Sequence, residues 1–485
     1  MNQNSQFDHK HPSHQHQRDG AAGPALRSRS PLSHLRIWAT AAGISLCLTA
    51  SAADRAVRPA SDVSYNGDGT SWAAATSNGG PGAYRGLPAG GSLIRGDTYY
   101  IAGGSYPGWT LNTPASSTTP ITIKKATVAS HGPSTGWSNS MGDTQATFSG
   151  MIQFTTRYWV FDGAVGGGPN PVGGSSSWKT GHGFKVTEKN SVPVIWVNGG
   201  GNVDISHVEL QGAGRNGAGG NIGNDGLQIY GGSGPVTLSH AYMHSMGRCM
   251  FYHGGGSSST MTASHLYTGQ HESVGAEHSE WAILRSSALF TVRWSIITHT
   301  EGTGGVIAGD NGQTTAEIYG NVFFADGTST WGTENNGLIA AFSTGSAAVN
   351  WKVYNNTFIN IPSGLSIYGI SGQSPSGNQA RNNYYYLSTS HSPGSGWTQS
   401  YEHFQNSGSA TGSSSTTGSG IPFANFANYD FRLNANTTAG TSLASPYNVD
   451  MFGKPRTSWT RGAIEFGTSQ NVLPPSNPRV QISTP

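Results

Sequence analysis

Ionisable side chains gather in the middle of this 485-residue sequence, between Asp225 and Glu301. Only 10% of the chain is charged, so this density exceeds what solubility requires. Near neutral pH an imidazole can act as a base, and a guanidinium can hold a carboxylate through two hydrogen bonds. The group consists of His240, His244, Arg248, His253, His265, His271, Glu272, Glu277, His278, Glu280, Arg285, Arg293, His299 and Glu301. We therefore look for the functional site here.

These residue types suit the removal of a proton that lies next to a carboxylate. That reaction needs a base, groups that withdraw charge from the carboxylate, and a proton donor for the leaving oxygen. We expect His271 or His244 to be the base. Arg248 and Arg285 are expected to neutralise the carboxylate. The residues expected to donate a proton, to orient the substrate or to contact it are Tyr230, Tyr252, His253, His278, Glu280 and Glu301.

A repeated strand pattern explains how residues so distant in sequence can meet. Short runs of alternating apolar and polar residues recur about every 25 to 35 residues, each followed by a turn. They are Val203–His207, Val236–His240, Met261–His265, Phe290–Trp294, Ala316–Gly320, Trp351–Asn355 and Asn378–Asn382. A second run recurs between them, at Asp225–Tyr230, Arg248–His253, Gly304–Gly309, Asn336–Ala341 and Ser363–Tyr368. Two or three strands per repeat, with no helix between them, predict the coils of a β-solenoid.

Stacked coils place equivalent residues of neighbouring repeats about 4.8 Å apart, whatever their distance along the chain. His244, residues 270–272 and residues 299–301 follow the first strand of their repeats, so we expect them to share one edge. The residues on or beside the second strand should line the adjoining face. They are Arg248, His253, Glu280 and Arg285.

Three asparagines predict a structural ladder. Asn321, Asn356 and Asn383 each stand one place after the repeated strand, where stacked amides can hydrogen-bond from coil to coil. Residues 388–420 are rich in Ser, Gly and Thr and poor in apolar residues. We interpret them as a long surface excursion before the closing coil.

A column of histidines also fits a structural role. His207, His240 and His265 occupy the same place in successive repeats and predict a stack at the surface. Cys249 lies in the apolar run Cys-Met-Phe and is expected to be a buried thiol.

The first 52 residues are expected to be a signal peptide. Arg27, Arg29 and Arg36 precede the apolar run 37–48, and Ala50-Ser51-Ala52 supplies the small residues of a cleavage site. The run is shorter than the roughly 20 residues that span a bilayer. We expect residues 53–467 to form one secreted domain without membrane attachment. Residues 468–485 should be an extended tail.

The charge balance after cleavage excludes some partners. The leader takes five of the 26 basic and two of the 24 acidic residues, which leaves 21 basic against 22 acidic. Such a chain has no basic field to attract nucleic acid or an anionic membrane, so neither is expected to bind. One cysteine remains, so no intramolecular disulfide can form.

Two phrases near the ends of the predicted domain carry a family resemblance. Gly96–Tyr106 contains Gly-Asp-Thr and Gly-Gly-Ser-Tyr, and a second phrase runs through Asp430–Leu433, Asp450, residues 453–456 and residues 462–466. They resemble the opening and closing coils of the pectate-lyase-like superfamily. The resemblance implies an all-β fold, a single-stranded right-handed parallel β-helix. It also implies a secreted polysaccharide lyase or a related carbohydrate-active protein.

The sequence departs from that superfamily at the catalytic motifs. The aspartate-rich calcium motif and the arginine motif of classical pectate lyases are absent, as are the paired aspartates of polygalacturonases. Gly181-His182-Gly183 matches a polygalacturonase tripeptide but stands alone. No catalytic residue is therefore carried over from a family.

We expect a monomer that cleaves a uronic-acid-containing polysaccharide by β-elimination, but two other functions stay open. Glycoside hydrolysis would use two carboxyl groups about 5–5.5 Å or 6.5–9.5 Å apart. The candidates for that pair are Glu272, Glu277, Glu280 and Glu301. A non-catalytic carbohydrate-binding protein would use exposed aromatic residues, for which the candidates are Trp281, Trp294, Tyr319 and Tyr354.

No cofactor is certain from the sequence, and no metal ligand is assigned. Ca²⁺ held by carboxylates and carbonyls could neutralise a uronate in place of arginine. The spacing of His271, His278 and Glu280 matches no zinc motif.

Overall fold

The protein is described by a computed structural model. It describes residues 52–165, 178–214, 223–232, 234–254, 256, 258–271, 280–285, 289–298, 307–309, 312–325, 339–341, 346–360, 367–369, 376–388 and 396–468. The expected signal peptide lies outside these residues except for residue 52, and the expected tail except for residue 468. In this part of the chain no helix is long and apolar enough to cross a membrane.

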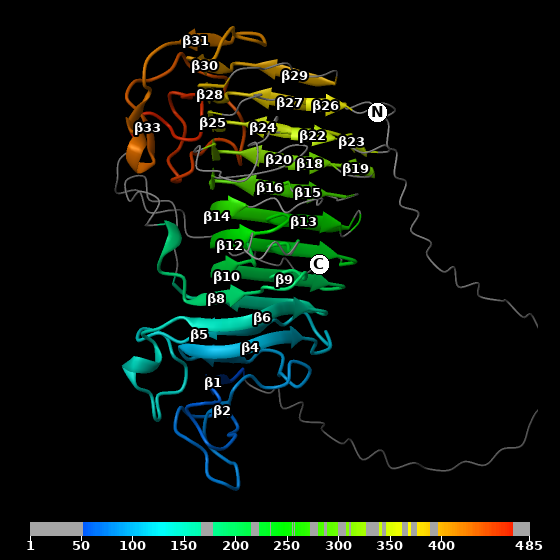
Figure 1. Cartoon of the computed structure of the whole chain (residues 1–485), viewed down its shortest axis with the longest axis vertical. Helices are drawn as coiled ribbons and strands as arrows, with labels where there is room; N and C mark the ends of the chain where they lie inside the picture. Colours follow the sequence, from blue (N-terminus) through cyan, green and yellow to red (C-terminus); the bar gives the residue numbers. More distant parts are fainter. Residues whose placement is uncertain are drawn as a thin grey trace, which may run out of the picture. The chain divides into compact units, whose positions relative to one another are not determined.

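Parallel strands stack one coil upon the next (Figure 1). Their pairings form three faces around one apolar interior. The chain adds a strand to face A, bends at a corner into face B, and reaches face C after a turn. It then returns to face A one coil further along. The right-handed parallel β-helix predicted from the repeat is confirmed.

The strands divide among the faces according to their pairing partners. Face A holds β2 (Tyr84–Arg85), β1 (Asp54–Arg58), β3 (Thr98–Ile101), β5 (Ile121–Lys125), β7 (Arg157–Asp162), the first halves of β10 (Gly201–Gln211), β12 (Gly234–Met246) and β14 (Ser259–His271), β16 (Leu289–Arg293), β20 (Ala316–Tyr319), β24 (Lys352–Tyr354), β27 (Asn378–Arg381) and β29 (Trp397–Ser400). Face B holds the first halves of β4 (Gly104–Leu111) and β6 (Ala146–Phe154), β8 (Phe184–Thr187), the second halves of β10, β12 and β14, β17 (Ile296–Thr298), β21 (Val322–Phe324), β25 (Thr357–Ile359), β28 (Tyr384–Tyr386), β30 (His403–Gln405) and β31 (Thr416–Gly418). Face C holds the second halves of β4 and β6, β9 (Ile195–Asn198), β11 (Leu227–Tyr230), β13 (Phe251–Gly254), β15 (Ala282–Leu284), β18 (Ile307–Gly309), β22 (Ile339–Ala341) and β26 (Ile367–Gly369). Outside the faces lie β19 (Gly312–Thr314) with β23 (Ser346–Ala348), β32 (Phe423–Asn425) with β33 (Asp430–Leu433), and the 3₁₀ turns η1 (Asn139–Met141) and η2 (Phe426–Asn428).

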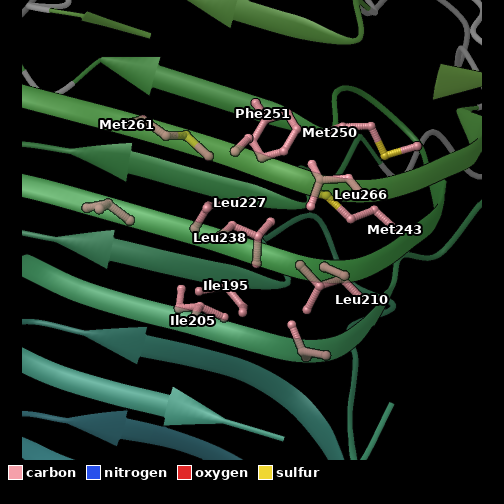
Figure 2. Packing of buried hydrophobic residues seen from close by; sticks show 14 of the residues in the cluster. Ile195, Ile205, Leu210, Leu227, Leu238, Met243, Met250, Phe251, Met261 and Leu266 are labelled. Carbon is pink, nitrogen blue, oxygen red and sulfur yellow. The ribbon is translucent and has the colours of Figure 1, made fainter. Parts of the chain in front are cut away.

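The register of face A matches the repeat read from the sequence. The first residues of five runs, from Val203 to Ala316, are backbone partners in successive coils. Alternate residues of each strand point inwards, so Ile205 and Leu238 from face A meet Leu227 and Phe251 from face C (Figure 2). The apolar half of the alternation thus fills the interior of every coil.

The asparagine ladder is confirmed. Asn321 donates from Nδ2 to Oδ1 of Asn356 at 3.1 Å, and Asn356 donates in the same way to Asn383 at 3.1 Å. All three side chains are fully buried. In the next coil Asn383 donates to Oε1 of Glu402 at 3.3 Å, so a glutamate takes the place of the fourth amide.

Glu402 should make stability depend on pH. Burial raises the pKa of this carboxyl to about 8, and hydrogen bonds from Asn383 oppose the rise only in part. The folded state therefore keeps a proton that the unfolded chain releases above its ordinary pKa near 4.5. The stabilisation is complete below pH 4.5 and is lost as pH rises through 8, by about 1.4 kcal/mol per pH unit.

The variant Glu402→Gln keeps a hydrogen-bonding side chain in the ladder but cannot ionise. We expect its free energy of unfolding in urea to fall less between pH 5 and pH 8 than that of the wild type. The control Glu317→Gln changes a partly exposed glutamate that pairs with Lys352. Equal pH slopes for wild type and Glu402→Gln would mean that Glu402 is ionised in the folded protein.

The interpretation of residues 388–420 as a surface excursion is wrong where the structure describes them. β29 pairs with β27, β30 with β28, and β31 with β30, so this segment continues the stack. Phe404 lies flat on Tyr385, with ring centroids 4.9 Å apart. One inward aromatic residue and a polar ladder complete the coil, and this leaves few apolar residues for a pattern search to find.

Residues 423–464 pack over faces A and B of the coils that contain β20, β24 and β28. Tyr447 packs edge-on against Tyr319 and Tyr354, each with ring centroids 4.9 Å apart. Asn355 donates a hydrogen bond to the carbonyl oxygen of Tyr447 at 3.0 Å. The expectation that four aromatic residues are exposed for sugar binding is therefore wrong. The exposed fractions are 0% for Trp281, 7% for Trp294, 2% for Tyr319 and 4% for Tyr354.

The two phrases that carry the family resemblance hold the ends of the stack. Asp97 accepts hydrogen bonds from the backbone of Ala53 and from Arg55, both at 2.9 Å, and so fixes β1. Near the other end Asp450 and Glu465 are buried and accept hydrogen bonds from several backbone N–H groups. These acidic residues therefore serve the fold.

Candidate functional site

Face C presents alternate side chains to the outside. Leu227 and Phe251 point into the core, so Gln228 and Tyr252, which are backbone partners, lie at the outward positions between them. Tyr252 is nevertheless only 7% exposed, so it can position neighbouring side chains more than it can contact a polymer. Tyr230 follows on the same side and is 53% exposed. An exposed tyrosine on a strand is a suitable platform for a sugar ring.

Gly254 brings the two tyrosines of face C together. A Cβ atom at this position would lie 3.1 Å from Cε1 of Tyr252 and 3.4 Å from Cδ2 of Tyr230. The two rings therefore flank a stretch of bare backbone. A larger residue at position 254 would push them apart.

Two arginines converge on Tyr252. The guanidinium carbon of Arg248, in the turn before β13, lies 5.1 Å from the centre of the Tyr252 ring. Arg285, directly after β15, lies 5.6 Å from the same ring. The sequence placed both arginines beside the second strand, and the structure brings them to one side chain. We call Tyr230, Arg248, Tyr252 and Arg285 the arginine–tyrosine patch.

Asp225 holds Arg248 in place and was not assigned from the sequence. Its Oδ1 accepts a hydrogen bond from Nε of Arg248 at 2.8 Å, and its Oδ2 accepts one from Nη2. The thiol of Cys249 donates to the same Oδ1 at 2.8 Å. Asp225 is 2% exposed, so this carboxylate serves the arginine and not a ligand. Its signal was its place at the start of the second run, one coil before Arg248.

Burial and charge act in opposite directions at this ion pair. Burial would lower the pKa of Arg248, but the hydrogen bonds and charge of Asp225 raise it above the usual value. Burial, with the charge of Asp225, raises the pKa of the Cys249 thiol. Cys249 is fully buried, as the sequence predicted. It is therefore a hydrogen-bond donor and not a nucleophile.

Two residues expected to contact substrate are fully buried. His253 is 0% exposed because it follows outward-facing Tyr252, and its Nε2 lies 3.1 Å from Oγ of Ser259. Burial lowers its pKa to about 4. Glu280, expected at the surface, is also 0% exposed. We remove both from the set of residues that can touch a polymer on face C.

His244 lies on face B, apart from the arginine–tyrosine patch. Its Nε2 is 3.2 Å from Oε1 of Glu209 and its Nδ1 is 3.0 Å from Oγ of Ser245, so both ring nitrogens have partners. The ring stacks on Tyr242 at 4.3 Å and is 8% exposed. The turn at residues 247–250 separates it from β13. The geometry describes a packed side chain more than a base.

Glu209 is the centre of the polar network around His244. Lys185 donates to its Oε1 at 2.6 Å, and Gln145 donates to its Oε2 at 3.2 Å. Burial would raise the pKa of Glu209, but the hydrogen bonds from His244, Lys185 and Gln145 lower it to about 2. This carboxylate is ionised and saturated with donors.

Other expected site residues are described in part or not at all. β14 ends at His271, whose backbone is the partner of Met246, but its side chain lies outside the described residues. His278 and Glu301 lie outside them entirely. Among the described side chains, no three His, Cys, Asp or Glu residues are grouped so that they could hold a metal ion.

Comparison with known proteins gives likeness in fold. No family model matches the sequence, and no curated protein matches it. Two solved structures of polysaccharide lyases are similar to this chain at low sequence identity. Pectate lyase Pel9A matches over 86% of this chain and 97% of its own, with 16% identity and a TM-score of 0.48. A variant of the PL6 family alginate lyase AlyGC matches over 78% of this chain and 56% of its own, with 11% identity and a TM-score of 0.37.

Both identities, 16% and 11%, are too low for any residue role to be carried over, and the candidate site rests on this chain's own residues. The exposed part of that site is cationic and aromatic. The carboxylates of Asp225 and Glu280 are not exposed to a ligand, because Asp225 is bound to Arg248 and Glu280 is fully buried.

Proposed function

We propose that the chain is a secreted polysaccharide lyase that cleaves a uronic-acid-containing polysaccharide by β-elimination. The observation that supports this most is the convergence of Arg248 and Arg285 on Tyr252, at an outer face of a chain with few charges. Two guanidinium groups beside one ring can bind the carboxylate of a uronate and withdraw charge from it. Export rests on the signal peptide expected at residues 1–52.

The proposed reaction divides its steps among few residues. A base removes the proton on C5 of the uronate, and the electron pair forms the C4–C5 double bond. The bond from C4 to the glycosidic oxygen breaks, and that oxygen takes a proton. Arg248 and Arg285 stabilise the negative charge that builds on the carboxylate. Tyr252 positions both guanidinium groups, and exposed Tyr230 offers a phenol that can protonate the leaving oxygen.

His271 is the better of the two histidines expected to act as the base. His244 has partners at both ring nitrogens and is buried on face B. The backbone of His271 ends β14 opposite Met246, where the chain of the preceding coil enters the turn that carries Arg248. We assign His271 as the base on this position in the coil.

Replacing each histidine with alanine tests this assignment. We expect His271→Ala to lower kcat by about a hundredfold or more, because general-base catalysis contributes 10²–10⁴. His244→Ala should lower kcat less than about tenfold and should mainly reduce stability, since Glu209 loses a buried partner. Initial rates over a range of pH give both values. A reversed order of the two variants would exclude His271 as the base.

Hydrolysis is the alternative enzymatic function. It needs two carboxyl groups beside the scissile bond, and the described carboxyls of face C are buried. A binding protein without catalysis would keep Tyr230 as its exposed aromatic residue. The proposed lyase makes better use of the paired arginines than either alternative.

The decisive experiment is product analysis on a panel of polymers. The purified mature chain is incubated with alginate, pectate, glycosaminoglycans and bacterial exopolysaccharides. A lyase produces an unsaturated uronate that absorbs in the ultraviolet, together with new reducing ends. Reducing ends without absorbance would establish hydrolysis instead. Binding without any product would establish a carbohydrate-binding protein.

A further inference from the structure

Four histidines lie at the corner where faces A and B meet. His207, His240 and His265 stack ring on ring in successive coils, with centroids 5.0 and 4.7 Å apart. Trp294 continues the stack in the next coil, 5.2 Å from His265. His182 packs beside them, stacked on Tyr242 at 6.5 Å. We call His182, His207, His240 and His265 the histidine corner.

The backbone at this corner does not require histidine. His207, His240 and His265 have φ angles of 55°, 52° and 55°, in the left-handed region. The equivalent positions after β24 and β27 are occupied by Asn355 and Asn382, with φ angles of 54° and 59°. Asparagine is favoured in this conformation, so the bend itself is explained without an imidazole. The three histidines therefore add a titratable stack to a turn that asparagine can make.

Carboxylates lie at one end of the histidine stack, and a positive charge lies at the other. Asp162 lies at one end, with Oδ1 2.7 Å from Nδ1 of His207, and Asp204 is near the same ring. At the other end Arg293 places a positive charge 4.3 Å above Trp294 and acts on His265. His265 is 2% exposed, and neither of its ring nitrogens has a hydrogen-bond partner. His182 is also 2% exposed, near Glu209.

These environments lower the pKa of His182, His240 and His265. Burial, with the charges of His207 and His182, lowers the pKa of His240 to about 4 against the attraction of Asp162. Burial, with His240 and Arg293, lowers the pKa of His265. Burial also lowers the pKa of His182. All three rings are neutral at neutral pH.

The histidine corner belongs to the coils that carry the arginine–tyrosine patch. The coil of β10 continues into β11 with Tyr230, and the coil of β12 continues into β13 with Tyr252. The coil of β14 leads to β15 and Arg285. Any opening at the corner therefore loosens the strands that position the candidate site.

We propose that the histidine corner is an acid-sensitive latch, which holds the coils of β10, β12 and β14 closed while its rings are neutral and opens them when its rings take up protons. Protonated rings about 5 Å apart in a buried stack repel each other strongly. The latch acts on the fold, so it does not depend on the proposed function.

The change of stability with pH follows from the difference in proton binding between the folded and unfolded states. The unfolded chain protonates its histidines near pH 6.5, whereas buried His240 resists protonation until about pH 4. Between these values the unfolded state binds more protons than the folded state. The contribution of these histidines to stability is therefore complete above about pH 6.5 and is lost as pH falls towards 4.

The test counts protons. Urea unfolding of the full mature chain, followed by circular dichroism from pH 4.5 to 8, gives the number of protons taken up on unfolding from the slope of stability against pH. We expect the double variant His240→Asn/His265→Asn to reduce that uptake near pH 5 by about two protons. The control His131→Asn changes a histidine that stacks on Trp137 and is not part of the histidine corner, and the effect of the double variant is measured against it. An unchanged uptake in the double variant would overturn the proposal.

A second measurement uses the wild type alone, in case the double variant fails to fold. Nuclear magnetic resonance of histidine-labelled protein should show ring signals that do not titrate between pH 8 and 5.5. Signals for every histidine that titrate near pH 6.5, without loss of the folded spectrum, would overturn the latch.

Discussion

Replacing Arg248 with alanine is expected to lower kcat/KM by about 10²–10³ for the polymer that the chain cleaves. The guanidinium group is fixed before substrate binds, by two hydrogen bonds to Asp225 and by its place over Tyr252. A preorganised cation of this kind stabilises charge that builds only in the transition state, so kcat should fall more than KM rises. Initial rates of ultraviolet absorbance give both constants.

In this experiment the effect of the substitution on stability must be separated from its effect on catalysis. Arg248→Ala leaves the carboxylate of Asp225 buried without its partner, a defect that costs about 3–5 kcal/mol. The double variant Arg248→Ala/Asp225→Ala removes both charges and should recover much of that stability. It should not recover activity.

A matched control is offered by Arg157, which lies 5.2 Å above Tyr158 beside face A. Arg157→Ala removes a similar arginine–tyrosine contact that does not involve Tyr252 and should leave kcat/KM within about twofold. Wild-type activity in a folded double variant would show that Arg248 takes no part in the reaction.

The repeat could be predicted from the sequence because each coil repeats the same physical problem. Val203, Val236 and Met261 must fill the same place in the interior, so they recur with the period of the coil. β15 was missed because its three residues, Ala282–Leu284, lie between a charged segment and Arg285 and show no alternation. Residues 388–420 were misjudged because Glu402 and its polar neighbours continue a hydrogen-bonded ladder. Polar residues inside a coil look like a loop when only hydropathy is read.

The candidate site was predicted less well than the fold. Arg248 and Arg285 were expected on one face, and they meet at Tyr252. His253 was placed on the wrong side, because a strand that reads Phe-Tyr-His does not reveal which residues point inwards. Asp225 was overlooked because its partner in the next coil is 23 residues away. Knowing that pairing requires the register of the coils, which turn lengths decide.

The second large effect is expected in the asparagine ladder. Asn356→Ala should lower the free energy of unfolding by about 4 kcal/mol. The substitution leaves two buried polar groups unsatisfied, and each costs about 1–3 kcal/mol. Oδ1 of Asn356 accepts from both the backbone N–H and Nδ2 of Asn321, each at 3.1 Å. Its Nδ2 donates to the carbonyl oxygen of Ile318 at 2.8 Å. Truncation leaves the Asn321 N–H and the Ile318 carbonyl without partners in a coil closed to water.

Urea unfolding at pH 7 measures this loss, and amide hydrogen exchange locates it. The amides of β20, β24 and β27 should exchange first in the variant, because the ladder ties these coils together at their corner. Asn425→Ala is the control, since this asparagine is exposed in the segment that follows the stack, and its change should stay within about 0.5 kcal/mol. A loss below about 1 kcal/mol for Asn356→Ala would mean that water replaces the amide and that the coils are held by their apolar interior alone.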